Sequence, residues 1–224
     1  MNLVGIKELV SFSAVVTTIL QFLSGTLVCK QYVVNRTTAE SSPLPFVCGF
    51  LSCGVWLLYG LIKQDNIIIL VNIVGVTLMI SYVFIFYIYT FKKSSVTQFV
   101  LHKNIVISAQ YTIFHLVVWS EDPWQRSMLV WNATCTLTLI TIAAPMSKLL
   151  YVIKSKCTDC LPFPMILMSF IVSSLWFFYG LIEQDYYMTV PNSIGGGLAV
   201  VQLSLFIIYP ATPYSSLVMK TTLA

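Results

Sequence analysis

The chain contains an internal repeat with an offset of 120 residues. Residues 56–65 read W-L-L-Y-G-L-I-K-Q-D, and residues 176–185 read W-F-F-Y-G-L-I-E-Q-D. The same offset pairs further positions along the chain: Asn72 with Asn192, Gly75 with Gly195, and Gly25 with Pro145. Two copies of one helical segment predict two related bundles with a working site between them, which is how many transporters are built.

The composition indicates a membrane protein. Of the 224 residues, 58% are hydrophobic and 9% are charged, and the mean hydropathy is +0.86. Soluble domains carry about 25% charged residues, and a chain of this size could not bury so much apolar surface without large exposed patches. The sequence also contains no phosphate-binding loop and no nucleophile–base constellation, so we expect no enzymatic activity, no cofactor and no nucleic-acid partner.

Hydropathy predicts seven membrane-spanning helices, at residues 9–29, 46–62, 67–91, 104–119, 127–147, 163–182 and 187–209. Most of these approach the roughly 20 apolar residues that cross a hydrocarbon core about 30 Å thick. The first segment lacks a basic leader and a small-residue cleavage site, so we expect a retained helix rather than a signal peptide. The predicted fold class is an all-α membrane protein.

The basic residues predict the orientation in the membrane. With the N-terminus outside, nine of the twelve basic residues fall on the cytosolic side: Lys30, Arg36, Lys92, Lys93, Lys103, Lys148, Lys154, Lys156 and Lys220. The positive-inside rule therefore predicts an external N-terminus and a cytosolic C-terminus.

The repeat and this topology agree. Three spans per copy would invert the second copy, and the extra span at 104–119 restores the parallel orientation. We therefore predict a 3+1+3 arrangement of two parallel three-helix bundles related by a pseudo-two-fold axis along the membrane normal. The predicted boundaries are 1–91 for the first repeat, 92–126 for the linker helix with its loops, 127–210 for the second repeat and 211–224 for a short tail.

These motifs resemble those of the SWEET (MtN3/saliva) family of sugar transporters, in its animal-type form. The resemblance rests on the two W-x-x-Y-G-L motifs, the paired asparagines, L-P-F at 44–46, A-P-M at 144–146 and L-P-F-P at 161–164. It covers about residues 10–210 and implies a facilitative sugar carrier. It also implies that each half is a three-helix bundle, and that a homo-oligomer is an expected assembly.

Four residues are the candidate substrate-binding set: Asn72, Asn192, Trp56 and Trp176. An asparagine in a membrane span is costly unless its amide has partners, and two donors with one acceptor oxygen suit the hydroxyls of a sugar. Indole faces can cover the C–H faces of a sugar ring, and the resemblance implies that these positions line the sugar site. The alternative interpretation is that the asparagines join helices and the tryptophans belong to an interfacial belt.

Prolines form a second set of candidate functional residues. In the family, one proline on each of the first, second, fifth and sixth spans forms a hinge-like tetrad; here the candidates are Gly25, Pro45, Pro145, and either Pro162 or Pro164. Proline can bend a helix, whereas Gly25 only weakens one, and we expect a proline at position 25 to be tolerated. The alternative for Pro45 and Pro162 is a helix-entry role. We expect Pro191 to unwind the seventh span.

The spans lack central charges. No Asp, Glu, Lys or Arg lies in the middle of a predicted span, and coupled carriers usually place an ionisable group there. His115, in the linker span, is the remaining titratable candidate and is expected to make a polar helix contact. We therefore predict an uncoupled carrier of glucose-like monosaccharides, in the plasma membrane or the Golgi. The alternatives are a PQ-loop-type carrier of another small solute, such as an amino acid, and a seven-span receptor.

The six cysteines carry weak signals. They lie within spans or at cytosolic ends, so we expect no structural disulfide. Cys157 and Cys160 have metal-like spacing, but a structural zinc site needs four ligands and no second pair follows. We expect no metal site.

Overall fold

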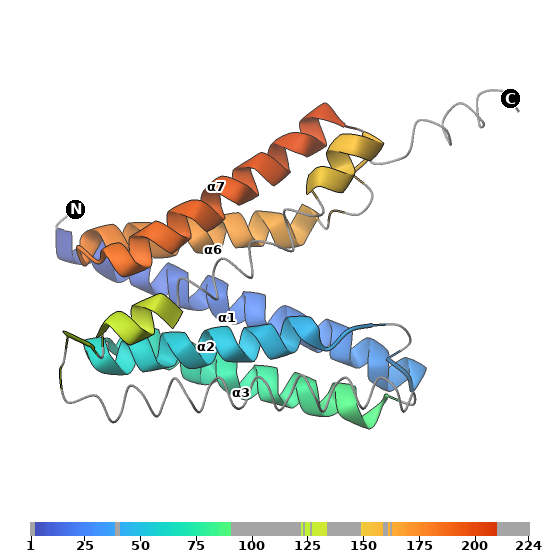
Figure 1. Ribbon diagram of the computed structural model, residues 1–224, viewed down its shortest axis with the longest axis horizontal. Helices are drawn as coiled ribbons and strands as arrows, with labels where there is room; N and C mark the ends of the chain where they lie inside the picture. The colour runs from blue at the N-terminus through green and yellow to red at the C-terminus, as the bar shows by residue number, and fades with distance from the viewer. Residues whose placement is uncertain are drawn as a thin grey trace, which may run out of the picture. The chain divides into compact units, whose positions relative to one another are not determined.

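The computed structural model is helical over most of the residues that it describes, which are 3–38, 41–90, 122, 124–125, 127–133, 149–158, 161 and 163–209. Its long helices are α1 (Leu3–Asn35), α2 (Leu44–Lys63), α3 (Asn66–Ile88), α6 (Phe163–Ile182) and α7 (Tyr186–Ile208) (Figure 1). Helical turns also cover 127–133 and 149–155. Each long helix is long and apolar enough to cross a membrane, which confirms five of the seven predicted spans. The span at 104–119, and 127–147 beyond residue 133, lie outside the described residues.

Helix α1 is longer than hydropathy predicts. It contains 33 residues, about 50 Å at 1.5 Å per residue, against a predicted span of 9–29. The predicted span stops at the charged residues Lys7, Glu8 and Lys30, although charge does not end a helix and the first proline of the chain is Pro43. Arg36 ends α1 in a left-handed conformation, with φ 52°. A helix of this length must tilt in a bilayer or extend beyond it.

The chain forms two compact units, whose borders follow the repeat. One unit comprises residues 18–137 and the other comprises residues 1–17 and 138–224, so the two borders are 138 − 18 = 120 residues apart. Helix α2 packs against α3 in the first unit, and α6 packs against α7 in the second (Figure 1). The first half of α1 therefore clusters with the helices of the second sequence repeat. The domain boundaries derived from the sequence stay a prediction.

The turn between α2 and α3 explains the end of the first repeated motif. Gln64 takes the left-handed conformation (φ 57°), and the N–H of Asp65 donates to the carbonyl of Gly60 at 3.0 Å. The carboxylate of Asp65 then accepts from the N–H groups of Ile67 and Ile68 at 2.9 and 3.2 Å. It caps α3, because the first N–H groups of a helix lack intrahelical acceptors.

The turn between α6 and α7 repeats this geometry. Gln184 is again left-handed (φ 53°), and the N–H of Asp185 donates to the carbonyl of Gly180 at 2.8 Å. Asp185 caps α7 through the N–H of Tyr187 at 3.1 Å. A Cβ on Gly180 would lie 2.6 Å from Oγ1 of Thr189. The repeated G-L-I-x-Q-D segment therefore supplies the turn and the helix cap that form a tight helical hairpin in each half.

The apolar cores of the two halves also match residue by residue. A cluster of the first half contains Cys29, Tyr32, Phe46, Tyr82 and Phe86, and one of the second half contains Leu149, Val152, Leu161, Ile166, Ala199 and Leu205. With the partly buried residues around them, these clusters share nine positions at the 120-residue offset: 29/149, 32/152, 46/166, 78/198, 79/199, 83/203, 85/205, 86/206 and 89/209. The repeat therefore specifies packing as well as helix order.

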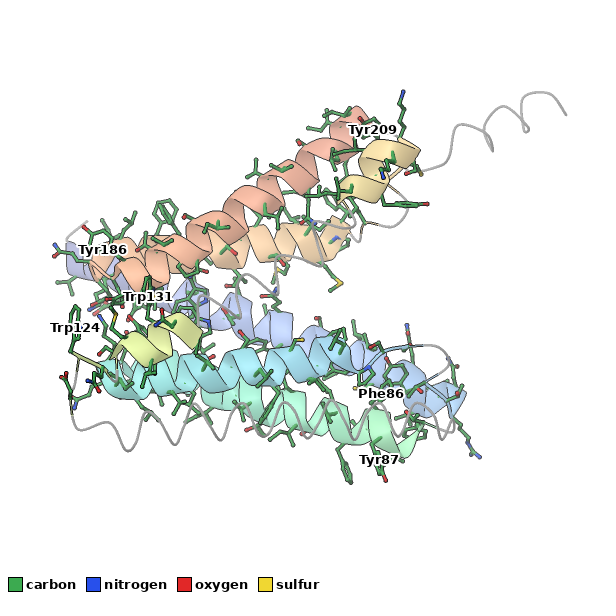
Figure 2. All side chains as sticks on the ribbon, viewed as in Figure 1. Phe86, Tyr87, Trp124, Trp131, Tyr186 and Tyr209 are labelled. Carbon is green, nitrogen blue, oxygen red and sulfur yellow. The ribbon has the colours of Figure 1, made fainter. Side chains whose placement is uncertain are left out.

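The outer surfaces of the helices are apolar. Phe12, Phe84 and Ile207 are 69%, 62% and 89% exposed, which suits side chains that contact lipid. Tyr186 and Tyr209 mark the two ends of α7 (Figure 2). Tyrosines at both ends of a span are typical of the aromatic belts at membrane interfaces.

Candidate functional site

In each helical hairpin, α2–α3 and α6–α7, one tryptophan and one asparagine lie equally far from the connecting turn. Trp56 lies eight residues before Gln64 and Asn72 lies eight residues after it, which is about 12 Å along each helix. Trp176 and Asn192 lie at the same distances from Gln184. Because the helices of each hairpin lie side by side (Figure 1), each half presents an indole and a carboxamide at matching heights.

The side chains of both asparagines turn back on their own helices. Nδ2 of Asn72 donates to the carbonyl of Ile68 at 2.8 Å, and Nδ2 of Asn192 donates to that of Met188 at 2.8 Å. Asn72 is 8% exposed and Asn192 is half-buried. Among the described residues, the structure shows no second hydrogen-bond partner for either amide.

Each tryptophan is held by a tyrosine one turn later. The rings of Trp56 and Tyr59 are 5.5 Å apart at 81°, and those of Trp176 and Tyr179 are 5.6 Å apart at 85°. Edge-to-face pairs of this kind are favourable, and both tyrosines are buried whereas both tryptophans are half-buried. The W-x-x-Y spacing therefore fixes the indoles while leaving part of each ring exposed.

Glycines one turn beyond the asparagines let neighbouring helices pack closely against these positions. A Cβ on Gly75 would lie 2.6 Å from Sγ of Cys53 and 2.8 Å from the ring of Phe22, so any larger residue must displace one of these side chains. A Cβ on Gly195 would lie 3.2 Å from Oγ of Ser173, the counterpart of Cys53. The second half is therefore less tightly packed at this level.

Two of the predicted hinge prolines lie in first turns. Pro45 is the second residue of α2, and Pro164 is the second residue of α6. An N–H at this position has no intrahelical acceptor, so the proline ring breaks no helical hydrogen bond. This favours the helix-entry interpretation over a bend at these residues and pairs Pro164 with Pro45. Pro145 and Pro162 lie outside the described residues, and a hinge role stays a prediction for all of them.

Gly25 is a packing site within a continuous α1. A Cβ on Gly25 would lie 2.5 Å from Cε2 of Tyr82, whose ring lies against the α1 backbone. The hydroxyl of Tyr82 donates to the carbonyl of Phe22 at 3.1 Å, and Tyr82 is 2% exposed. This contact argues against the expectation that a proline would be tolerated at position 25, because the ring of Tyr82 occupies the space that its Cβ would need.

Pro191 does not unwind the seventh span, contrary to expectation. Helix α7 runs unbroken through it, and Pro191 is buried. The Asp185 cap and the buried side chains of Met188 and Thr189 hold the first turns. A proline removes one hydrogen bond, and membrane helices tolerate that loss when their surroundings compensate.

The central parts of the described helices carry no charged residue. Lys7, Glu8 and Lys30 lie towards the ends of α1, Lys63 is the last residue of α2, and α3, α6 and α7 contain no Asp, Glu, Lys or Arg. Over the same part of the chain, no group of three His, Cys, Asp or Glu residues could hold a metal ion. His115 lies outside the described residues.

Two structural roles differ from anything that the residue pattern predicted. Asp65 and Asp185 are the caps of α3 and α7, and an acidic residue directly before an apolar run is a signal that could have found them. Tyr82 could not have been found in this way, since only the structure shows its ring over Gly25.

Comparisons with known proteins agree with the 120-residue repeat. The family model "Sugar efflux transporter for intercellular exchange" (MtN3/slv) matches the chain twice, at residues 8–94 and 128–213, which begin 128 − 8 = 120 residues apart. The chain is 39% identical to the sugar transporter SWEET1 of Drosophila pseudoobscura pseudoobscura over 93% of this chain and 92% of the relative. It is 29% identical to the bidirectional sugar transporter SWEET1 of Arabidopsis thaliana, over 86% and 79%.

A solved structure of a eukaryotic SWEET transporter has the same fold. Its TM-score is 0.79 at 23% sequence identity, covering 90% of this chain and 97% of that one. This likeness confirms the predicted fold class, an all-α membrane protein.

Proposed function

The chain belongs to the SWEET (MtN3/saliva) family of sugar transporters, and from this premise we propose that it carries sugars across a membrane. It is a transporter and not an enzyme. Transport is facilitative and bidirectional, and it proceeds by alternating access of one site to the two sides. The observation that carries the proposal is the pair of matched asparagines, which have the same hydrogen bond in both halves.

The proposed substrate is a single-ring sugar such as glucose. Asn72 and Asn192 each keep an N–H donor and a carbonyl acceptor for the adjacent hydroxyls of a ring. Trp56 and Trp176 are fixed by their tyrosines, and their exposed faces would cover the C–H faces of the sugar. Two amides and two indoles match the size of one ring.

The transport is proposed to be uncoupled. Proton- and sodium-driven carriers usually place an ionisable side chain in the middle of a span, and the described helices have none there. The sugar would then move down its own gradient until the concentrations on the two sides are equal.

The proposed placement follows the basic residues. The N-terminus lies outside and the C-terminus in the cytosol, because this orientation puts most lysines and arginines on the cytosolic side. We place the carrier in the plasma membrane or the Golgi, with a homo-oligomer as its assembly. Gly25, Pro45, Pro145 and Pro164 (or Pro162) would line the cytosolic gate.

Flux into vesicles tests the function. Purified protein in liposomes should admit labelled glucose more rapidly than sucrose, with galactose and fructose completing the panel, and uptake should stop at equal concentrations. Imposing a pH gradient should change neither the rate nor the final level. Accumulation against the gradient would refute uncoupled transport, and uptake of amino acids without sugar uptake would favour a PQ-loop-type carrier.

A further inference from the structure

One ion pair joins parts of the chain that are far apart in sequence. Nζ of Lys7, in α1, lies 2.5 Å from Oε1 of Glu183, directly after α6, and the two side chains are 45% and 31% exposed. The residues are 183 − 7 = 176 positions apart. Lys7 belongs to the first sequence repeat and Glu183 to the second, although both lie in the same compact unit.

The first half of α1 is closely packed next to this pair. Ser11 and Ala14 are 6% and 0% exposed and lie four and seven residues after Lys7, on the same helix face. The hydroxyl of Ser11 donates to the carbonyl of Lys7 at 2.6 Å. Small side chains let membrane helices approach closely, so the outer end of α1 is held by packing as well as by charge.

The corresponding positions of the other repeat do not form an ion pair. Glu183 corresponds to Lys63, whose Nζ lies 5.9 Å from the centre of the Tyr59 ring. Lys7 corresponds to Ser127. Lysine and serine carry no opposite charges, so this charge contact is a feature of one side of the pseudo-symmetric molecule.

We propose that Lys7 and Glu183 form an outer latch that closes the external side of the transporter. The inference rests on the proposed transport function, in which the two repeats move relative to each other. A contact between the outer end of α1 and the α6–α7 turn joins one repeat to the other. In this proposal the start of α1 moves relative to the α6–α7 turn, and the contact breaks each time the sugar site opens to the outside.

The latch has a measurable signature. An exposed ion pair shifts an equilibrium by up to about fivefold. Breaking it populates the outward-open state, and the apparent affinity rises with the fraction of protein that is competent to bind. The half-saturating sugar concentration should therefore fall about two- to fivefold when measured from outside and rise when measured from inside. A purely structural role would lower the amount of folded protein without this opposite change.

Charge-reversal variants distinguish the latch from a purely structural role of the ion pair. Lys7→Glu and Glu183→Lys each place like charges together, and each should produce the opposite change in the two half-saturating concentrations. The double variant Lys7→Glu/Glu183→Lys restores an ion pair and should return both values to those of the wild type. Equal changes on both sides, or a double variant no closer to the wild type than the singles, would overturn the latch.

Cross-linking tests whether the contact must break. Lys7→Cys/Glu183→Cys, joined by a short reducible bis-methanethiosulfonate reagent, should lose at least about tenfold in sugar flux and regain it with reductant. The matched control is Thr38→Cys/Thr90→Cys, because the two hydroxyls are 3.2 Å apart within the first repeat, and joining them should leave flux unchanged. Full flux through the cross-linked Lys7–Glu183 variant would refute the latch, whereas absent sugar flux in the wild type would instead refute the proposed function.

Discussion

Interior glycines of the first half lie against side chains, whereas neighbouring atoms are farther from the glycines of α7. The nearest atom to an added Cβ would be at 2.5 Å for Gly25, 2.8 Å for Gly49 and 2.6 Å for Gly75. Along α7 the distance rises to 3.2 Å for Gly195 and 3.7 Å for Gly196, and no atom lies within 4 Å for Gly197. Gly25, Gly49 and Gly75 of the first half are therefore more closely packed than the three glycines of α7.

This difference suggests different mechanical roles. Helix α3 has Gly75 in contact with α2 and α1 and is fastened to α1 by the Tyr82 hydroxyl. Helix α7 contains Pro191 and three consecutive glycines, and each glycine weakens a helix by about 1 kcal/mol relative to alanine. We infer that α3 is the stiffer and α7 the more deformable of the two helices that carry the asparagines.

The largest expected effect concerns the paired asparagines, which occur in both halves. Asn72→Ala and Asn192→Ala should each lower sugar flux between about fivefold and about 150-fold, since each removes two hydrogen bonds of about 0.5–1.5 kcal/mol to the sugar. Asn72 is buried and Asn192 half-buried, so Asn72→Ala should also lower the melting temperature more. Flux in liposomes and thermal unfolding in detergent measure both. Normal flux in a folded Asn192→Ala carrier would contradict the proposed site.

The next effect concerns Gly25 and Tyr82. Gly25→Pro removes a helical hydrogen bond in α1 and collides with the Tyr82 ring, so it should destabilise the protein by about 3 kcal/mol or more. The second repeat pairs Pro145 with Gln202 at these positions. Gly25→Pro/Tyr82→Gln copies that pair and should recover part of the lost stability in thermal unfolding, because it removes the ring. Tyr82→Gln alone is the control, and a double variant less stable than Gly25→Pro would rule out the collision as the cause.

A smaller effect compares matched glycines. Gly75→Ala must displace Cys53 or Phe22, and overpacking of this kind costs about 1–3 kcal/mol. Gly195→Ala requires only a small shift of Ser173, whose Oγ would lie 3.2 Å from the new Cβ. Its cost should therefore be smaller than that of Gly75→Ala, and the higher helix propensity of alanine offsets part of it. Melting temperatures of the two variants measure the contrast. Equal destabilisation would show that the two halves are packed alike.

The helices and the repeat can be predicted from the sequence because hydropathy and residue identity record them directly. Five predicted spans coincide with α1, α2, α3, α6 and α7 to within a few residues, apart from the longer α1. The two W-x-x-Y-G-L motifs indicate the family in the same way, since they are visible in the order of the residues alone. Whether the asparagines and tryptophans bind sugar stays a prediction.

The role of individual glycines and prolines cannot be predicted from the sequence. The pattern along α1 suggests a loosened hinge at Gly25, but its role depends on Tyr82, a residue 57 positions away (82 − 25 = 57). The pattern along α7 suggests unwinding at Pro191, yet the cap and the packing around it preserve the helix. In both cases the deciding contacts are tertiary, and a pattern along one helix does not contain them.

The smallest expected effect tests the deformability of α7. An alanine Cβ at position 197 meets nothing within 4 Å, so Gly197→Ala should stabilise α7 by up to about 1 kcal/mol and raise the melting temperature by about 2–4 °C. If α7 deforms in each transport cycle, the same change should slow sugar flux. The matched control is Thr77→Gly at the corresponding position of α3, where Thr77 bonds only the carbonyl of Ile73 in its own helix. That variant should lower stability by a similar amount without accelerating transport. A stabilised Gly197→Ala carrier with wild-type flux would show that transport does not depend on the flexibility of α7, and the two halves would then differ in packing alone.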